Sequence, residues 1–239
     1  MLENAILLAG GKGTRLRPLT FDVPKPLIKI NGKPIIEYAL EELERNGISK
    51  VYVSLGYKAQ KVIKYLEHRK KFGADIEYVI ESKPLGTGGA IRYAMGKMQR
   101  YEDVAIVYGD TIFSAEMQKM HEFHKEMGAL VTIGSTVVEN VKGFGVLEEK
   151  DGRVVGFVEK PEPSAVKSKM VNSGIYIVNR SIVEKFPKLE SFSFEKDFLQ
   201  KVYTNEKIFH HPIGKFITVN DIEQYKKAKE AMRIAGGEI

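Results

Sequence analysis

Residues 5–20 read AILLAGGKGTRLRPLT and place a short apolar run directly before three glycines and several cationic side chains. The run predicts a buried strand, because four to eight apolar residues bounded by glycines suit the centre of a sheet. The glycines allow the backbone to approach a bulky anion and to turn N–H groups toward it, and an arginine fork matches phosphate oxygens. The residues concerned are Gly10, Gly11, Gly13, Lys12, Arg15 and Arg17. A strand followed by a phosphate-binding loop is therefore predicted.

Two better-known phosphate loops are excluded by their spacing. A P-loop needs a glycine separated by four residues from Gly-Lys, and a hydroxyl residue directly after the lysine. Around Gly11-Lys12 those places hold Ile6 and Gly13. The dinucleotide fingerprint G-x-G-x-x-G, started at Gly11, fails at Leu16. The loop therefore belongs to another class of phosphate site.

Strand and helix signals alternate over the first half of the chain. Apolar runs predict strands, and apolar residues at helical spacing predict the helices between them. The strands are 5–9, 51–55, 76–80 and 104–108, and the helices are 36–43, 59–69 and 88–98. Such alternation is typical of an α/β fold, in which a mainly parallel sheet is flanked by helices on both faces.

The second half of the chain is less regular. Strands are predicted at 130–137 and 175–178, a hairpin at 144–149 and 153–159, and a closing helix at 221–234. The hairpin turns at Asp151-Gly152, a sequence typical of tight turns. We expect one domain over residues 1–239, with a mixed sheet and a small β lobe over the carboxyl ends of the parallel strands. Open α/β sheets bind ligands at that edge.

The composition restricts the class of protein. With no cysteine in 239 residues, disulfides and thiolate chemistry are excluded. The net charge of +6 is spread along the chain, which favours a phosphate-rich small molecule as partner over nucleic acid. No apolar run approaches the roughly 20 residues that cross a bilayer, and the start of the chain does not resemble a signal peptide. We therefore expect a cytoplasmic protein that does not bind membranes.

The motif at residues 10–20, followed by Pro24-Lys25-Pro26, resembles the signature of the sugar-1-phosphate nucleotidylyltransferases, or sugar-nucleotide pyrophosphorylases. The resemblance covers nearly the whole chain and implies a Rossmann-like nucleotidyltransferase domain. It also implies that the chain does not carry the left-handed β-helix domain of acetyltransferase-fused members. Further matching segments are Leu85–Ala90, Gly109-Asp110, Gly145-Val146, Glu159–Pro161 and Asn172–Gly174.

By this resemblance, the glycine loop wraps a nucleoside triphosphate, and Lys25 stabilises charge at the transferring phosphate. Glu81 precedes the segment that resembles the family's base-binding segment. A carboxylate only accepts hydrogen bonds, so it suits the neighbouring N–H and amino groups of guanine, whereas uracil and thymine offer one donor. The implied nucleotide-binding residues are Leu8, Ala9, Gly10, Gly11, Gly13, Thr14, Arg15, Glu81, Gly86 and Thr87.

The implied reaction needs few specialised groups. A sugar 1-phosphate is already an anionic nucleophile, so its attack on an α-phosphorus requires positioning and cations and no general base. The resemblance implies that Asp110 holds Mg²⁺ and that Lys160 holds the sugar phosphate. The implied catalytic residues are Arg15, Lys25, Asp110 and Lys160. The implied sugar-binding residues are Gly109, Gly145, Glu159, Lys160 and Asn172.

One segment departs from the family pattern. Members commonly read Phe-Ile-Asp-Ile-Gly-Thr-Pro-Glu-Asp-Tyr near the end of the domain, and that first aspartate completes the metal site. Residues 216–225 read FITVNDIEQY, so Thr218 stands in place of the aspartate. A neutral hydroxyl binds Mg²⁺ more weakly than a carboxylate does. Asn220 and Asp221 are the two candidates to compensate.

The chain looks most like the short heptose 1-phosphate guanylyltransferases, followed by the mannose 1-phosphate guanylyltransferases. We therefore expect transfer of GMP from GTP to heptose or mannose 1-phosphate. Thymidylyl-, uridylyl- and cytidylyltransferases for another sugar phosphate or phosphocholine are the alternatives. A non-catalytic relative that binds sugar nucleotides is a second alternative, motivated by Thr218, although all four implied catalytic residues are present. The assembly, including a homodimer, is left open.

Overall fold

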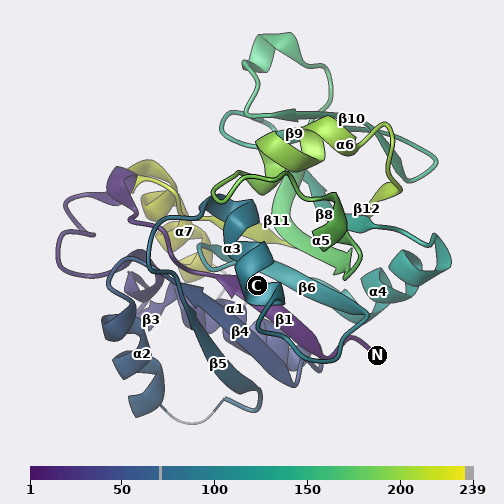
Figure 1. Ribbon diagram of the computed structural model, residues 1–239. Coiled ribbons are helices and arrows are strands. Elements are labelled where there is room, and N and C mark those ends of the chain that lie inside the picture. The colour runs from purple at the N-terminus through teal and green to yellow at the C-terminus, as the bar shows by residue number, and fades with distance from the viewer. Residues whose placement is uncertain (70–71, 235–239) are drawn as a thin grey trace.

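A mixed sheet of nine strands runs through the molecule in the order β5-β4-β1-β6-β11-β8-β12-β10-β9 (Figure 1). The computed structural model describes residues 1–69 and 72–234. The strands are β1 Asn4–Leu8, β4 Lys50–Leu55, β5 Asp75–Ile80, β6 Asp103–Tyr108, β8 Val131–Val137, β9 Gly145–Lys150, β10 Arg153–Glu159, β11 Met170–Asn179 and β12 Ile208–Pro212. The helices are α1 Ile35–Arg45, α2 Ala59–His68, α3 Gly86–Met95, α4 Met117–Glu126, α5 Ile182–Lys185, α6 Gln200–Val202 and α7 Ile222–Ile234.

The first half of the sheet is parallel, as the alternation of strand and helix signals predicts. β1 pairs in parallel with β4 on one side and with β6 on the other, and β4 pairs in parallel with β5. Helices α1, α2 and α3 provide the crossovers between these strands. The carboxyl ends of all four strands therefore meet at one edge of the sheet, where ligands bind in folds of this class.

The second half of the sheet is mostly antiparallel. β11 runs antiparallel to both β6 and β8, while β12 is parallel to β8. The predicted hairpin is confirmed as β9 and β10, and both turn residues, Asp151 and Gly152, have the positive φ that such a tight turn requires. In Figure 1 this hairpin and α6 lie at the top of the molecule, at the opposite end of the sheet from β5.

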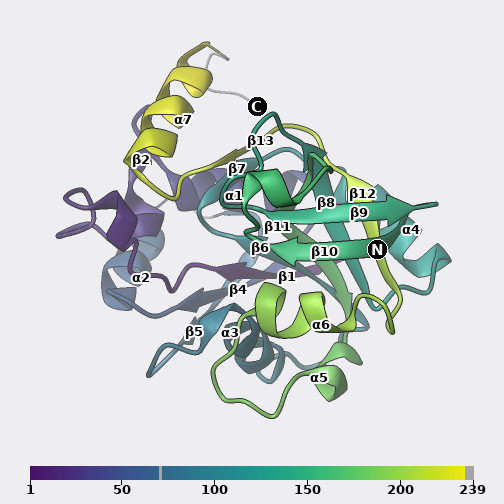
Figure 2. The ribbon, with the colours of Figure 1, turned by 90° about the horizontal axis from the view of Figure 1, so that it is seen from above.

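Helices cover both faces of the sheet, and each face has its own core. Apolar side chains of α1, α2 and α4 pack on one face, and those of α3 and the segment 192–199 pack on the other. Seen from above, α3 and α5 lie on the opposite side of the sheet from α1 and α7 (Figure 2). α7 packs on a third cluster beside α1, which includes Leu16 of the glycine loop.

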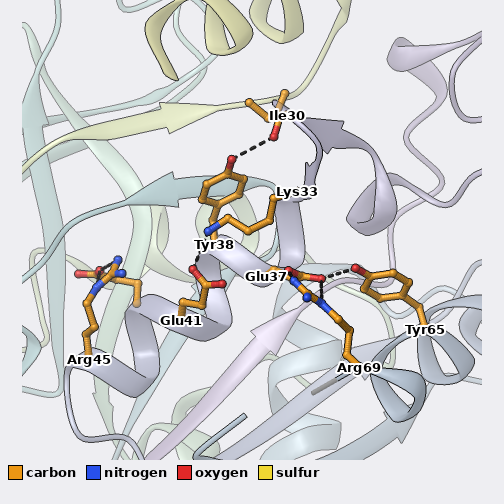
Figure 3. A network of polar contacts seen from close by, with 9 residues as sticks. Ile30, Lys33, Glu37, Tyr38, Glu41, Arg45, Tyr65 and Arg69 are labelled. Carbon is orange, nitrogen blue, oxygen red and sulfur yellow. Dashed lines mark hydrogen bonds and ion pairs between the residues drawn. The ribbon is translucent and has the colours of Figure 1, made fainter. Parts of the chain in front are cut away.

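A buried carboxylate joins α1 to α2 (Figure 3). Glu37 of α1 is fully buried, and it accepts hydrogen bonds from the Tyr65 hydroxyl and the Arg69 guanidinium. Arg69 is two-fifths exposed, so its charge stays partly hydrated while its head group pairs with Glu37. The nearby pair between Lys33 and Glu41 lies at the surface of α1.

The structure also contains elements that the sequence pattern does not predict. Two small two-stranded sheets join β2 Lys29–Ile30 with β3 Lys33–Pro34, and β7 Thr111–Phe113 with β13 Phe216–Thr218. β11 is longer than the predicted strand and includes an irregular register between Asn172 and Tyr176. In the described ranges, none of the helices is both long and apolar enough to cross a membrane.

Candidate active site

Three parallel strands end around a pair of adjoining cavities. β1 leads into the glycine loop, β5 into Glu81, and β6 into Gly109 and Asp110. The larger cavity has a volume of about 560 Å³ and the smaller about 270 Å³, and Asp110 lies in the wall of both. The structure thus brings all the predicted nucleotide-binding residues to these two walls: Leu8, Ala9, Gly10, Gly11, Gly13, Thr14, Arg15, Glu81, Gly86 and Thr87.

The glycine loop is folded back on the segment that carries Lys25. Gly13 has a φ of 61°, and a Cβ there would lie 3.0 Å from the Cβ of Lys25. The Thr20 hydroxyl donates to the carbonyl of Gly13 at 2.8 Å. At the end of the loop, the ammonium of Lys61 on α2 donates to the carbonyl of Asp22 at 2.9 Å. Glycine is favoured at position 13 because a side chain there would be both strained and crowded.

Lys25 is held between two oxygens in the smaller cavity. Its ammonium lies 2.5 Å from Oδ2 of Asp110, and it donates to Oδ1 of Asn220 at 3.0 Å. The side chains of Lys25 and Asp110 are 12% and 24% exposed, so water screens their charges less than at the surface. A cation, a carboxylate and an amide oxygen therefore face the same cavity as the glycine loop.

The oxygens of Asp110 and Asn220 fit a divalent cation. They already converge on one positive group, the ammonium of Lys25, and hard cations such as Mg²⁺ prefer carboxylate and amide oxygens. In the described part of the chain, no cluster of three His, Cys, Asp or Glu side chains could hold a metal ion. Mg²⁺ commonly takes one or two carboxylates and completes its shell with phosphate oxygens and water. The residues present suit that mode of binding.

Thr218 does not line the smaller cavity, and its neighbour Asn220 does. β13 sets Thr218 opposite Thr111 of β7, and the Thr218 hydroxyl donates to Oε1 of Gln224 at 3.2 Å. Asp221 accepts from the backbone N–H of Gln224 at 2.8 Å, which caps the start of α7. Of the two candidates to compensate for the missing aspartate, only Asn220 therefore directs its side-chain oxygen to the group around Asp110.

Glu81 lies in the wall of the larger cavity, directly after β5. Its Oε1 accepts from the Ser54 hydroxyl at 3.0 Å, and its Oε2 accepts from the backbone N–H of Leu85 at 3.3 Å. A Cβ at Gly10 would lie 2.9 Å from Oε1, so the glycine makes room for the carboxylate. Each carboxylate oxygen has two lone pairs, so both keep an acceptor direction after these contacts.

The glycines at the start of α3 allow close packing as well as lining the cavity. A Cβ at Gly86 would lie 2.5 Å from the carbonyl oxygen of Phe192, and one at Gly88 would lie 2.1 Å from its ring. The Thr87 hydroxyl donates to Oε2 of Glu195 at 2.9 Å. The glycine motif thus brings the segment around Phe192 and Glu195 against the wall of the larger cavity that contains Gly86 and Thr87.

Of the predicted sugar-binding residues, Gly145, Glu159 and Asn172 gather between β9, β10 and β11, whereas Gly109 follows β6 and lies in the wall of the smaller cavity. Gly145 and Glu159 are opposite each other in the hairpin. A Cβ at Gly145 would lie 2.8 Å from Oε2 of Glu159 and 3.5 Å from Cβ of Asn172. Burial raises the pKa of Glu159, and the negative charge of Glu195 adds to this effect, while Lys160 opposes it.

Of the four predicted catalytic residues, all of which the structure describes, Lys160 is the one that lines neither cavity. Its ammonium lies 2.9 Å from Oε1 of Glu159, and its side chain is 58% exposed. Its φ of 49° places it in the left-handed region, where a residue other than glycine is uncommon. The ammonium is thus exposed, and Glu159 is its one ion-pair partner among the described residues.

Sequence reasoning did not identify a buried polar group that lies between the larger cavity and the residues Glu159 and Asn172. Glu195 accepts hydrogen bonds from the hydroxyls of Thr87, Ser193 and Tyr108, and from that of Tyr176 at 3.4 Å. Burial, followed by the charge of Glu195, raises the pKa of Tyr108 and Tyr176 well above the usual value. Both tyrosines lie in runs that predict only strands; the available signal was a single glutamate within the aromatic stretch SFSFEKDFL, residues 191–199.

A comparison with protein-family models finds that residues 4–217 match the nucleotidyl transferase family. The chain belongs to this family. The membership confirms the family that the motifs at residues 10–26 predict, and with it the α/β nucleotidyltransferase fold.

Similar proteins include two kinds of guanylyltransferase. The D-glycero-α-D-manno-heptose 1-phosphate guanylyltransferase of Aneurinibacillus thermoaerophilus is 36% identical over 231 residues, which cover 96% of this chain and 98% of that protein. The mannose-1-phosphate guanylyltransferase of Mycobacterium tuberculosis is 35% identical over 196 residues, 81% of this chain and 54% of that protein. The chain thus spans nearly the full length of the first relative and about half of the second.

Solved structures share the fold over almost the whole chain. The crystal structure of HddC from Yersinia pseudotuberculosis complexed with GMP-PN has a TM-score of 0.83 and 32% identity, and the match covers 97% of this chain and 100% of that one. A UDP-glucose pyrophosphorylase complexed with UDP-glucose has the same TM-score, with 98% and 100% covered. At 20% identity, this second likeness shows the fold alone.

Proposed function

We propose that the chain transfers GMP from GTP to heptose or mannose 1-phosphate and releases pyrophosphate. The observation that carries the proposal is the group formed by Lys25, Asp110 and Asn220, which faces the glycine loop in a member of the nucleotidyl transferase family. The identity to two kinds of sugar-phosphate guanylyltransferase supports both the base and the sugar class.

The proposed reaction is an in-line displacement at the α-phosphorus of GTP. A phosphate oxygen of the sugar phosphate forms the new bond, and the bond from the α-phosphorus to the bridging oxygen breaks, so that pyrophosphate leaves. The nucleophile is already anionic and gives up no proton, so the site needs no general base. The main barrier is repulsion between anions, which positioning and fixed positive charges reduce.

The cationic side chains have distinct proposed roles. Arg15 binds the triphosphate from the glycine loop, whose backbone N–H groups cradle the same oxygens. Lys25 lies beside Asp110 and stabilises the charge that develops around the α-phosphate. Lys160 turns from Glu159 to the phosphate of the sugar. Asp110 and Asn220 would hold Mg²⁺, which supplies charge neutralisation at the phosphates when bound.

Glu81 is the proposed reader of the base. Its two oxygens are fixed by Ser54 and Leu85, and both keep a free acceptor direction in the wall of the larger cavity. Guanine presents an N–H and an amino group side by side, which pair with such a carboxylate. A base with a single donor on that edge leaves one oxygen unpaired, which disfavours its binding.

The test measures pyrophosphate release from GTP with heptose 1-phosphate and mannose 1-phosphate in the presence of Mg²⁺. We expect turnover with at least one sugar phosphate, loss of turnover in excess chelator, and a loss of at least a hundredfold in Asp110→Asn. Asp151→Asn, in the exposed turn of the β9–β10 hairpin, is the matched control and should keep full activity. Full activity of Asp110→Asn, or turnover with chelator present, would contradict the role given to Asp110.

Two further parts of the proposal concern the protein in the cell. We propose a cytoplasmic location, where nucleoside triphosphates are available, and fractionation of the source cells tests it. The assembly is open between monomer and homodimer, and light scattering on the purified protein decides between them.

A further inference from the structure

A chain of hydrogen bonds leads from Glu195 to the predicted sugar-binding residue Asn172. The hydroxyl of Tyr176 donates to Oε1 of Glu195 at 3.4 Å, and it accepts from Nδ2 of Asn172 at 2.6 Å. Oδ1 of Asn172 accepts from the backbone N–H of Gly174 at 3.0 Å. All three side chains are buried, with 8% exposure at Asn172, none at Tyr176 and 7% at Glu195.

The donor-to-acceptor direction of this series of hydrogen bonds is fixed at both ends. A backbone N–H only donates, so Gly174 must face the oxygen of the Asn172 amide. A carboxylate only accepts, so the Tyr176 hydroxyl must point its proton to Glu195 and offer its lone pair to Asn172. Burial, followed by the charge of Glu195, raises the pKa of Tyr176 well above its usual value, so the hydroxyl retains the proton that it donates. Both constraints give the Asn172 amide the same orientation.

One N–H of Asn172 remains after these contacts. The Nδ2 amide has two hydrogens, and the described residues supply one acceptor for them, the Tyr176 hydroxyl. Glu159 lies nearby, because a Cβ on Gly145 would approach both side chains. A sugar hydroxyl between the two side chains can therefore donate to the Glu159 carboxylate and accept from Asn172. The pair has a defined polarity, one acceptor beside one donor.

Glu195 is itself fixed by the elements around it. Four hydroxyls point to its two oxygens: Tyr108 and Tyr176 to Oε1, Thr87 and Ser193 to Oε2. The residue lies on the π-helical turn Phe194–Leu199, a rare element that is frequent at functional sites. The hydroxyl of Ser193 also accepts from the backbone of this turn. The Glu195 carboxylate is thus held in place at the end of the series of hydrogen bonds that leads to Asn172.

We propose that Tyr176 and Glu195 are positioning residues for the sugar phosphate: they orient the Asn172 amide so that it presents an N–H to a sugar hydroxyl. The inference rests on the proposed function, because it concerns the sugar side of that same site. It explains why Tyr176 on β11 and Glu195 on the π-helical turn are buried polar residues that line neither cavity, although Glu195 accepts hydrogen bonds from Thr87 and Tyr108 in the wall of the larger one.

The test compares Tyr176→Phe with the wild type, using the sugar phosphate that the wild type turns over fastest. Phenylalanine keeps the ring but removes the acceptor for Asn172, so the amide loses its fixed orientation. We expect the KM for the sugar phosphate to rise about tenfold, while the KM for GTP stays within about twofold. Tyr203→Phe is the matched control, because Tyr203 packs on the same core and its hydroxyl makes no hydrogen bond within residues 1–69 and 72–234.

Two more variants keep the inference testable if Tyr176→Phe does not fold. Glu195→Gln leaves one acceptor oxygen for four hydroxyls, so the same rise in the sugar KM is expected. Asn172→Asp keeps the acceptor for Gly174 but removes both N–H groups, the one that donates to Tyr176 and the free one, and it should raise the sugar KM at least as much.

The outcomes separate the inference from the proposed function. An active Tyr176→Phe enzyme with an unchanged sugar KM refutes the inference alone, as does an equal rise in the KM values for GTP and the sugar phosphate. Absence of turnover in the wild type with every sugar phosphate removes the proposed function and the inference with it. A tenfold rise confined to the sugar phosphate supports both.

Discussion

Replacing Lys25 with methionine removes one positive charge from the smaller cavity and keeps most of the side-chain volume. The ammonium lies 2.5 Å from Asp110, and the two side chains are 12% and 24% exposed, so its field in the cavity is only partly screened. Unit charges about 4 Å apart interact by roughly 4 kcal/mol at an effective dielectric constant near 20. Removing one preorganised donor of this kind typically costs about 3–4 kcal/mol in the transition state, or 10²- to 10³-fold in kcat.

The assay for Lys25→Met is the initial rate of pyrophosphate release over a matrix of GTP and sugar phosphate concentrations. We expect kcat to fall at least a hundredfold and the KM for GTP to change by less than tenfold, because the charge acts where negative charge develops. Lys29→Met, an exposed lysine of β2, should behave as the wild type. An increase in the KM for GTP with an unchanged kcat would show that Lys25 contributes to ground-state binding only, and would refute its proposed role.

Three further predictions address the base, the acid side of stability and the contact between helices. Glu81→Gln should reduce the preference for GTP over other triphosphates by roughly ten- to hundredfold in kcat/KM, since an unpaired donor or acceptor costs about 1–3 kcal/mol. An unchanged preference would show that the base does not bind at Glu81. Asp103 is buried, which opposes its ionisation, but contacts with His121, His124 and Asn179 outweigh burial and hold its pKa well below the usual 3.8. Because the pKa of Asp103 is lower in the folded than in the unfolded state, its ionised carboxylate stabilises the fold at pH values above the unfolded-state pKa. That contribution is lost as the pH falls below about 4, so the urea midpoint of unfolding should drop less on acidification in Asp103→Asn than in the wild type. Glu37→Ala should lower the free energy of unfolding by about 1–3 kcal/mol in a denaturant titration, since Tyr65 loses its acceptor while the partly exposed Arg69 regains water. Glu41→Ala breaks only a surface pair and should change the free energy of unfolding by less than about 1 kcal/mol in the same titration.

Much of the fold follows from local patterns in the sequence. The runs at 5–9, 51–55 and 104–108 correspond to β1, β4 and β6, because strands buried on both faces read as continuous apolar segments, and the run at 76–80 corresponds to the edge strand β5, which is largely half-buried and includes Glu77. Asp151-Gly152 predicts the hairpin through its turn geometry. The small sheets β2–β3 and β7–β13 were not predicted, since strands of two or three residues are too short for a period to show. β11 was predicted only over its apolar part, 175–178, because Asn172, Ser173 and Gly174 interrupt the apolar run where the register with β8 is irregular.

The candidate site was predictable where its residues follow a motif. The glycine loop and Asp110 are adjacent in space because β1 and β6 are adjacent parallel strands; the alternation of elements predicts that the strands are parallel, but not that β6 pairs with β1. The position of Asn220 was not predictable, because it depends on how β13 and the cap of α7 place residues 218–221. Glu195 was missed for a similar reason. Its four hydroxyl partners come from positions 87, 108, 176 and 193, and only the folded sheet brings these together.

The proposal that this chain is a guanylyltransferase for heptose or mannose 1-phosphate is tested by competition between nucleotides. The wild-type protein and Mg²⁺ are incubated with equal concentrations of GTP, dTTP, UTP and CTP. Heptose, mannose and glucose 1-phosphates are added in separate reactions, and the sugar-nucleotide products are identified by mass spectrometry. We predict that the GDP-sugar predominates, by roughly tenfold or more over each other nucleotide, with heptose or mannose 1-phosphate. Predominance of a dTDP-, UDP- or CDP-sugar with every sugar phosphate would contradict it.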